Sequence, residues 1–102
     1  MYAISPVQVV TGRQVLDHQT VLVQGRQISG ILSADSTIPP GFSVIQGDDQ
    51  LLIPGMIDVH IHGANGFDMT DGSIESILET SLACSRTGCT GFVRPAWALS
   101  IR

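Results

Sequence analysis

Lysine is absent from the 102 residues, and the five arginines are scattered among nine acidic residues, so the formal net charge is -4. Proteins that bind nucleic acid present a concentrated basic surface, and we therefore expect no nucleic-acid partner. No apolar run reaches the roughly 18 residues that a membrane-spanning helix needs. The N-terminus also lacks a basic region followed by an apolar stretch. These absences predict no membrane partner, no secretion and a cytoplasmic location.

Cysteine is scarce, and the two thiols, Cys84 and Cys89, are five positions apart. A disulfide is typical of secreted proteins, and a Cys-x4-Cys metal site needs two further ligands nearby. We expect two buried thiols and keep the disulfide and the metal site as alternatives. Charged residues make up only 14% of the chain and hydrophobic residues 43%, which favours a compact piece whose surfaces pack against partners.

Short β-branched or aliphatic runs, separated by turn residues, fill the chain up to about residue 52. They predict strands over residues 7–10, 14–16, 20–23, 27–32 and 42–45. Gln24-Gly25-Arg26 has the composition of a hairpin turn, and the Pro and Gly content of 36–41 predicts a loop. This part of the chain is therefore expected to be a β-rich unit.

The pattern changes after Pro54-Gly55, where residues 56–62 predict a buried strand. Ser73 is a predicted helix N-cap, and Glu75 in the first turn favours the helix dipole. The helix is expected to end near Gly88, followed by a strand over 89–93. One helical face is predicted to carry Ile74, Ile77, Leu78 and Leu82. The order strand, helix, strand predicts a βαβ unit with parallel strands.

Two histidines, His60 and His62, fall on one face of the predicted strand, because side chains alternate along a strand. Neutral imidazole is the commonest ligand of zinc-like ions, so the pair predicts a metal site. Asp58 lies on the same face, where it can orient the ligands from the second shell. The alternative is a pair of solvated or core histidines. In the loop that follows, Asn65, Asp68 and Asp71 either contact substrate or stabilise a turn.

Family resemblance is carried by the run Pro54-Gly55-Met56-Ile57-Asp58-Val59-His60-Ile61-His62-Gly63, which is similar to the first barrel strand of the amidohydrolase superfamily. The next residues, His62-Gly63-Ala64-Asn65-Gly66-Phe67-Asp68 with Asp71-Gly72, resemble the N-acetylglucosamine-6-phosphate deacetylase family. Gly88-Cys89-Thr90-Gly91-Phe92 resembles that family's second barrel strand. The similarity runs from about residue 1 to 93 and fails at Arg94.

An α/β fold follows from this resemblance. Residues 1–54 would form a small β-sandwich, and residues 55–102 the first βαβ unit of a (β/α)8 TIM barrel. A complete barrel takes about 250 residues, so the barrel is expected to be incomplete and the chain truncated.

The resemblance also implies an activity, the hydrolysis of N-acetylglucosamine 6-phosphate to glucosamine 6-phosphate and acetate. His60 and His62 would bind a divalent metal, with zinc expected and iron or another ion as alternatives. The family's catalytic Asp and its other metal ligands follow later barrel strands. We therefore expect no catalytic residue here, an inactive chain when alone, and a homodimer for the full-length protein. The alternatives are a non-catalytic β-rich binding module and part of another amidohydrolase, such as an N-acyl amino-acid deacylase.

Overall fold

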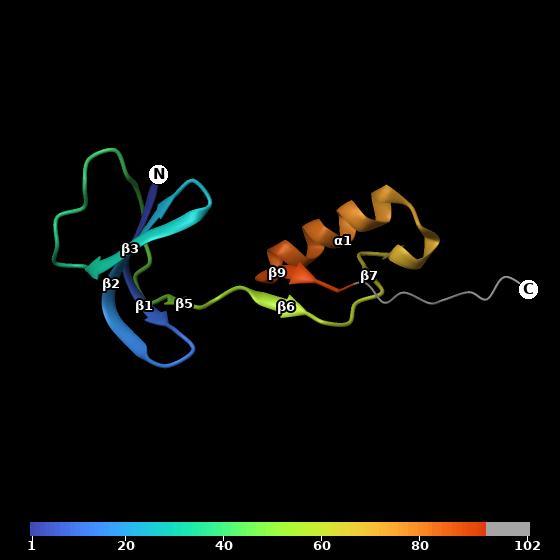
Figure 1. Ribbon diagram of the computed structural model, residues 1–102, viewed down its shortest axis with the longest axis horizontal. Helices are drawn as coiled ribbons and strands as arrows, with labels where there is room; N and C mark the ends of the chain where they lie inside the picture. Colours follow the sequence, from blue (N-terminus) through green and yellow to red (C-terminus); the bar gives the residue numbers. More distant parts are fainter. Residues whose placement is uncertain (94–102) are drawn as a thin grey trace, which may run out of the picture. The chain divides into compact units, whose positions relative to one another are not determined.

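The computed structural model describes residues 1–93, and its internal contacts divide the chain into two units (Figure 1). The first is Met1–Pro54, and the second begins at Gly55. This division falls at the position where the sequence changes from short β runs to the βαβ pattern. Arg94, where the family resemblance fails, lies outside the described residues together with the eight residues that follow it.

The first unit is one five-stranded mixed sheet. Its strands are β1 (Tyr2–Val10), β2 (Val15–Gln24), β3 (Gln27–Ser33), β4 (Ser43–Ile45) and β5 (Leu51–Leu52). Strand β1 pairs antiparallel with β2, and β2 pairs antiparallel with β3. The short strands β4 and β5 both run parallel to β1, one beside its beginning and one beside its end. The second layer of the expected sandwich is not seen among the described residues, because both short strands join the sheet that contains β1.

The core of this unit lies against one face of β1, where every second residue is buried. Val7 and Val9 pack with Val21 of β2, and Ile4, Leu16, Val23 and Leu52 surround them. The buried hydroxyls of Ser5 and Thr20 satisfy each other at 2.6 Å. Alternation of small apolar residues therefore fixes which face of the sheet is covered.

Strand β2 differs from the prediction of two separate strands over 14–16 and 20–23. It is one strand with a bulge, because Val7 to Val9 spans two positions on β1 while Gln19 to Leu16 opposite spans three. His18 lies in this bulge with a positive φ of 52°. The polar residues that interrupted the β pattern mark the bulge and not a break between strands.

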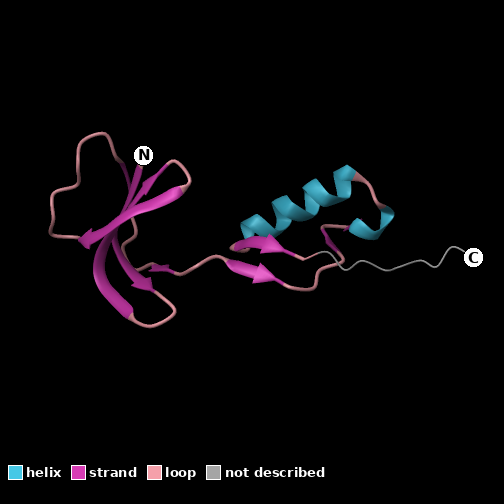
Figure 2. Ribbon diagram, viewed as in Figure 1, coloured by secondary structure: helices cyan, strands magenta, loops and turns pink. Residues whose placement is uncertain are grey.

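The second unit contains the predicted βαβ arrangement (Figure 2). Strands β6 (Met56–Asp58) and β9 (Cys89–Phe92) are parallel and are connected through helix α1 (Ile74–Arg86). Between β6 and α1 lie the two-residue strands β7 (Gly63–Ala64) and β8 (Phe67–Asp68) and the 3-10 turn η1 (Met69–Asp71). Within residues 1–93 no helix is long and apolar enough to span a membrane.

Helix α1 begins and ends where the sequence predicts. The Ser73 hydroxyl accepts the backbone N–H of Ser76 at 3.0 Å, and Glu75 occupies the first turn. The chain leaves the helix at Gly88, whose φ of 83° is left-handed.

The buried face of α1 was not foreseen. Ser76, Thr80 and Cys84 are the buried residues of the helix, which contacts β7, β8 and β9. The predicted apolar face stays exposed, with exposed fractions of 76% for Ile74, 58% for Leu78 and 51% for Leu82. Small side chains allow the close approach of helix and strands, and the large apolar ones point away from that contact.

Candidate metal centre

His60 and His62 lie in the segment between β6 and β7, beyond the end of the strand. The prediction of a strand through residue 62 is therefore wrong, since β6 ends at Asp58. The physical reason is local. Asp58 Oδ1 accepts the backbone N–H of His60 at 3.0 Å, and this side-chain bond turns the chain out of the strand direction. Pairing with the neighbouring strand also ends here, opposite Phe92 of β9.

The two imidazoles nevertheless come together. Their Nε2 atoms are 3.2 Å apart, and the rings meet edge to face with centroids 5.0 Å apart and planes inclined by 73°. Two nitrogens bound to one tetrahedral zinc ion, each at 2.0–2.1 Å, lie about 3.3 Å from each other. The side chains present therefore fit a shared divalent ion. The same separation also suits an N–H···N hydrogen bond between two neutral rings.

Asp58 acts on this pair through the backbone. The Asp58 carboxylate accepts a hydrogen bond from the backbone N–H of His60 and not from an imidazole nitrogen. The backbone carbonyl oxygen of Asp58 accepts the N–H of Val93 at 2.8 Å. Asp58 is half-buried and links the segment that carries the imidazoles, through its carboxylate, to the end of β9, through its carbonyl oxygen. This arrangement is how Asp58 can orient the first histidine, and its role in positioning a metal ligand stays a prediction.

The backbone of His62 is held from the other side. Its carbonyl oxygen accepts the N–H of Met69 at 2.8 Å, and the Met69 side chain is fully buried. Gly63, the next residue, packs so closely on the opposite strand that a Cβ there would lie 1.9 Å from the Phe67 carbonyl oxygen. Only glycine fits this approach.

A third protein ligand is not found in the part of the chain that the structure describes, where no group of three His, Cys, Asp or Glu side chains is placed to hold a metal. The two imidazoles are both exposed. A metal held by these two imidazoles alone would keep its other coordination positions open to water. Catalytic zinc sites likewise keep one coordination position for water or substrate.

The loop residues singled out in the sequence have structural roles. Asn65 and Gly66 have φ angles of 53° and 82° and form the two-residue turn between β7 and β8. Asp68 Oδ1 accepts the backbone N–H of Thr70 at 2.8 Å, and this bond lowers the pKa of Asp68 below its usual 3.8. The Asp71 carboxylate accepts from the Ser73 N–H and the Ser76 hydroxyl at the start of α1. Substrate contact by Asn65 or Asp68 stays a prediction.

The hairpin itself was missed by the sequence reasoning. Asn-Gly is the strongest two-residue hairpin signal, and it stands between two short segments that pair with each other. Asn65-Gly66 could therefore have been recognised as the turn that brings Asp68 back beside Gly63.

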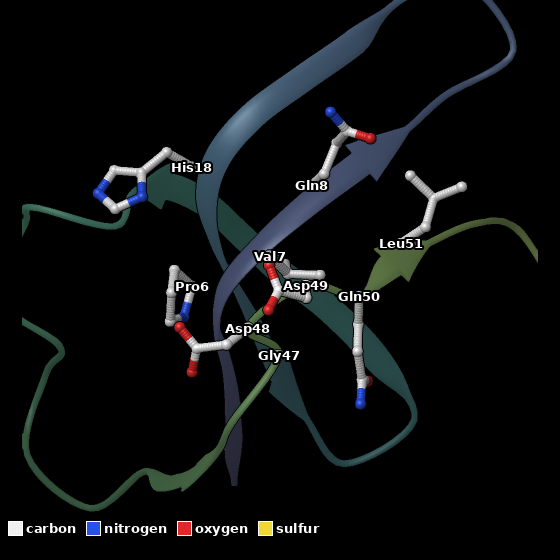
Figure 3. A pocket seen from close by; sticks show the side chains of 9 residues that line it. All are labelled: Pro6, Val7, Gln8, His18, Gly47, Asp48, Asp49, Gln50 and Leu51. Carbon is white, nitrogen blue, oxygen red and sulfur yellow. The ribbon is translucent and has the colours of Figure 1, made fainter.

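A pocket of about 460 Å³ lies in the first unit (Figure 3). It is lined by Pro6, Val7, Gln8, His18, Gly47, Asp48, Asp49, Gln50 and Leu51. The His18 ring turns away from the two aspartates, and its Nε2 lies 3.1 Å from Asp35 Oδ1 instead. This pocket therefore does not gather the donor side chains of a metal site.

Comparisons with known proteins give no matching family model. An N-acetylglucosamine-6-phosphate deacetylase of Bacillus subtilis is 30% identical over 88% of this chain and 23% of its own length. An N-acetylgalactosamine-6-phosphate deacetylase of Escherichia coli O157:H7 is 33% identical over 71% of this chain and 17% of its own length. The chain thus spans less than a quarter of these curated relatives.

One solved structure with the same fold is that of an N-acetylglucosamine-6-phosphate deacetylase from Pasteurella multocida. It superimposes with a TM-score of 0.84 over 91% of this chain and 24% of its own, at 24% sequence identity. At this identity the likeness shows the fold of the region.

Proposed function

We propose that this chain, whose curated homologues and structural neighbour are amino-sugar-phosphate deacetylases, is the N-terminal part of a metal-dependent N-acetylglucosamine-6-phosphate deacetylase. The reaction would be hydrolysis of the acetamide, which gives glucosamine 6-phosphate and acetate. The observation that carries this proposal is the 3.2 Å separation of the His60 and His62 Nε2 atoms. It occurs directly after the first strand of a βαβ unit, within the region that the relatives share.

The fold supports the same assignment. In (β/α)8 barrels the active site lies at the C-terminal ends of the strands, and both imidazoles follow the C-terminal end of β6. We infer that β6, α1 and β9 are the first unit of such a barrel. The exposed apolar side chains of α1 would then face other parts of a longer protein.

The side chains of this site would hold the metal and would not carry out the proton transfers themselves. The Nε2 atoms of His60 and His62 lie 3.2 Å apart, and Asp58 and Met69 fix the backbone on either side of them. A bound divalent ion, zinc or iron, would polarise the amide carbonyl and lower the pKa of a bound water toward neutrality. The role of this chain in catalysis is therefore to supply two ligands and to hold them in position.

A second substrate is favoured by one observation, since the 33% identical relative is named for N-acetylgalactosamine 6-phosphate. The two sugars differ only in the configuration at one hydroxyl. The predicted homodimer also stays a prediction.

A chimera tests the proposal. Residues 1–93 of this chain would replace the matching N-terminal region of the Bacillus subtilis relative, and acetate release would be followed with each of the two sugar phosphates and with unphosphorylated N-acetylglucosamine. We expect turnover of a sugar phosphate that falls at least about a hundredfold in His60→Ala and in His62→Ala, more than the loss of an outer-shell residue. The control His18→Ala changes another exposed imidazole and should leave turnover unchanged.

Two outcomes would contradict the proposal. Turnover that survives both substitutions in one chimera would show that these histidines are not ligands of the reacting metal. A chimera with a native circular dichroism spectrum that binds zinc but releases no acetate would favour the non-catalytic binding module.

A further inference from the structure

Cys84 and Cys89 lie on either side of a tight turn at the end of α1. The N–H of Thr87 donates to the Cys84 carbonyl oxygen at 3.1 Å, and the N–H of Gly88 donates to the Ser85 carbonyl oxygen at 3.3 Å. Gly88 reverses the chain in a left-handed conformation and delivers Cys89 as the first residue of β9. The turn thus brings the last buried residue of the helix back beside the start of the strand.

Both thiols line one pocket of about 390 Å³, which Asp58, Ile61 and Ala64 also line. Both are free in this structure, and Cys84 is buried as expected from the sequence, whereas Cys89 is only half-buried. Burial raises the pKa of Cys84, and the neighbouring Cys89 thiol raises it further. Because both side chains line this one pocket, the thiols are neighbours in a space that a small reagent can enter.

We propose that Cys84 and Cys89 form a dithiol modification site, which closes to an intrachain disulfide when it reacts with a small disulfide such as oxidised glutathione. The pocket shares Asp58 with the proposed metal centre, but neither cysteine is a proposed metal ligand, and the test does not depend on deacetylase activity.

The reaction proceeds by two exchanges. The Cys89 thiolate, from the more exposed residue, attacks one sulfur of oxidised glutathione, forms a mixed disulfide and expels one glutathione thiolate. The Cys84 sulfur then attacks Cys89 Sγ, loses its proton and expels the second glutathione. The dithiol is oxidised by two electrons, and one oxidised glutathione becomes two reduced molecules. Cys89 Sγ, which donates to the Gly91 carbonyl oxygen at 2.9 Å, gives up that bond when the ring closes.

The equilibrium with glutathione measures whether the folded turn favours this bond. The full chain, native or in guanidinium chloride, would be incubated with mixtures of oxidised and reduced glutathione, trapped with an alkylating reagent and weighed by mass spectrometry. We expect the equilibrium constant for the intrachain disulfide to be at least about tenfold larger for the native chain, which corresponds to about 30 mV. An equal or smaller constant in the native chain would overturn the proposal. Recovery of disulfide-linked dimers alone would do so too, because the chain has no other cysteines.

Single substitutions test the order of the two exchanges. Cys84→Ser should accumulate the mixed disulfide at Cys89, while Cys89→Ser should react with oxidised glutathione at least about tenfold more slowly. Equal rates in the two variants would overturn the assignment of Cys89 as the attacking thiol. Cys84→Ala serves beside Cys84→Ser in case the buried hydroxyl disturbs folding, and circular dichroism of each variant confirms the native fold.

Discussion

The Nε2 atoms of His60 and His62 lie 3.2 Å apart although neither residue belongs to a strand. Their proximity comes from two backbone hydrogen bonds, one to the Asp58 carboxylate and one from the N–H of Met69. If both rings bind one metal ion, substitution of Asp58 as well as of the two histidines should change metal affinity.

Zinc should bind to the 102-residue chain weakly, with a dissociation constant of about micromolar or higher, because two imidazoles leave half of a tetrahedral shell without protein ligands. Isothermal titration at neutral pH would measure this affinity. The double substitution of His60 and His62 by Ala should abolish binding, and His18→Ala should not change it. Tight stoichiometric binding by the doubly substituted chain would contradict the assignment.

Substitution of Asp58 should change metal affinity through the backbone. Asp58→Ala removes the acceptor for the His60 N–H and should weaken zinc binding by about tenfold. Asp58→Asn keeps an oxygen acceptor and should bind zinc within about twofold of the unsubstituted chain. Titration of the three proteins separates the two contributions. An equal loss in both variants would show that the carboxylate charge matters, and not the hydrogen bond.

Thr80→Val is expected to stabilise the second unit. The Thr80 hydroxyl is fully buried and has no hydrogen-bond partner among the described residues. Valine has nearly the same shape without the unsatisfied group, so the free energy of unfolding should rise by about 1 kcal/mol. Urea unfolding would measure it. Thr80→Ala is the control, since it also removes the hydroxyl but leaves a cavity and should lower stability.

The stability of the β7–β8 hairpin should depend on pH through Asp68. Its pKa is lowered in the folded chain, chiefly by the hydrogen bond from the Thr70 N–H. A lowered folded pKa means that this stabilisation is present above the ordinary value of 3.8 and is lost as the pH falls through the folded value. Asp68→Asn should therefore flatten the fall in unfolding free energy below about pH 4. An unchanged pH profile in the variant would contradict this role.

The 102-residue chain alone should release no acetate from N-acetylglucosamine 6-phosphate. Within its described residues only two ligand side chains converge, and the carboxylates of Asp58 and Asp68 are both hydrogen-bonded to the backbone. A positioned general base is therefore lacking there. A sensitive acetate assay beside a full-length relative would check this. Turnover by the purified monomeric chain, lost in His62→Ala and on chelation, would refute it.

The sequence predicts the bounds of an element correctly where one interaction determines them. The end of α1 just before Gly88 follows from one left-handed position, and its start follows from the Ser73 hydroxyl. The alternation of apolar residues identifies β1 over its second half. It does not identify residues 2–6, because the buried positions there are Ala3 and Ser5, whose small side chains carry no strong β signal.

Features that depend on competing interactions were not predicted. The strand propensity of Ile57, Val59 and Ile61 favours an extended segment. The Asp58 carboxylate, however, accepts the backbone N–H of His60, and β6 ends at Asp58. The apolar residues of α1 share a helical face as predicted. Which face is buried depends on the space beneath the helix, and that space is set by residues distant in sequence.

The hydrogen bond from the Met69 N–H to the His62 carbonyl oxygen anchors the backbone of His62 to a fully buried residue. The backbone N–H of His60 is held instead by the carboxylate of the half-buried Asp58. We therefore expect NMR relaxation on the nanosecond timescale to report a more rigid backbone at His62 than at His60. If both rings bind one ion, His60 would then lose the larger share of conformational entropy on binding.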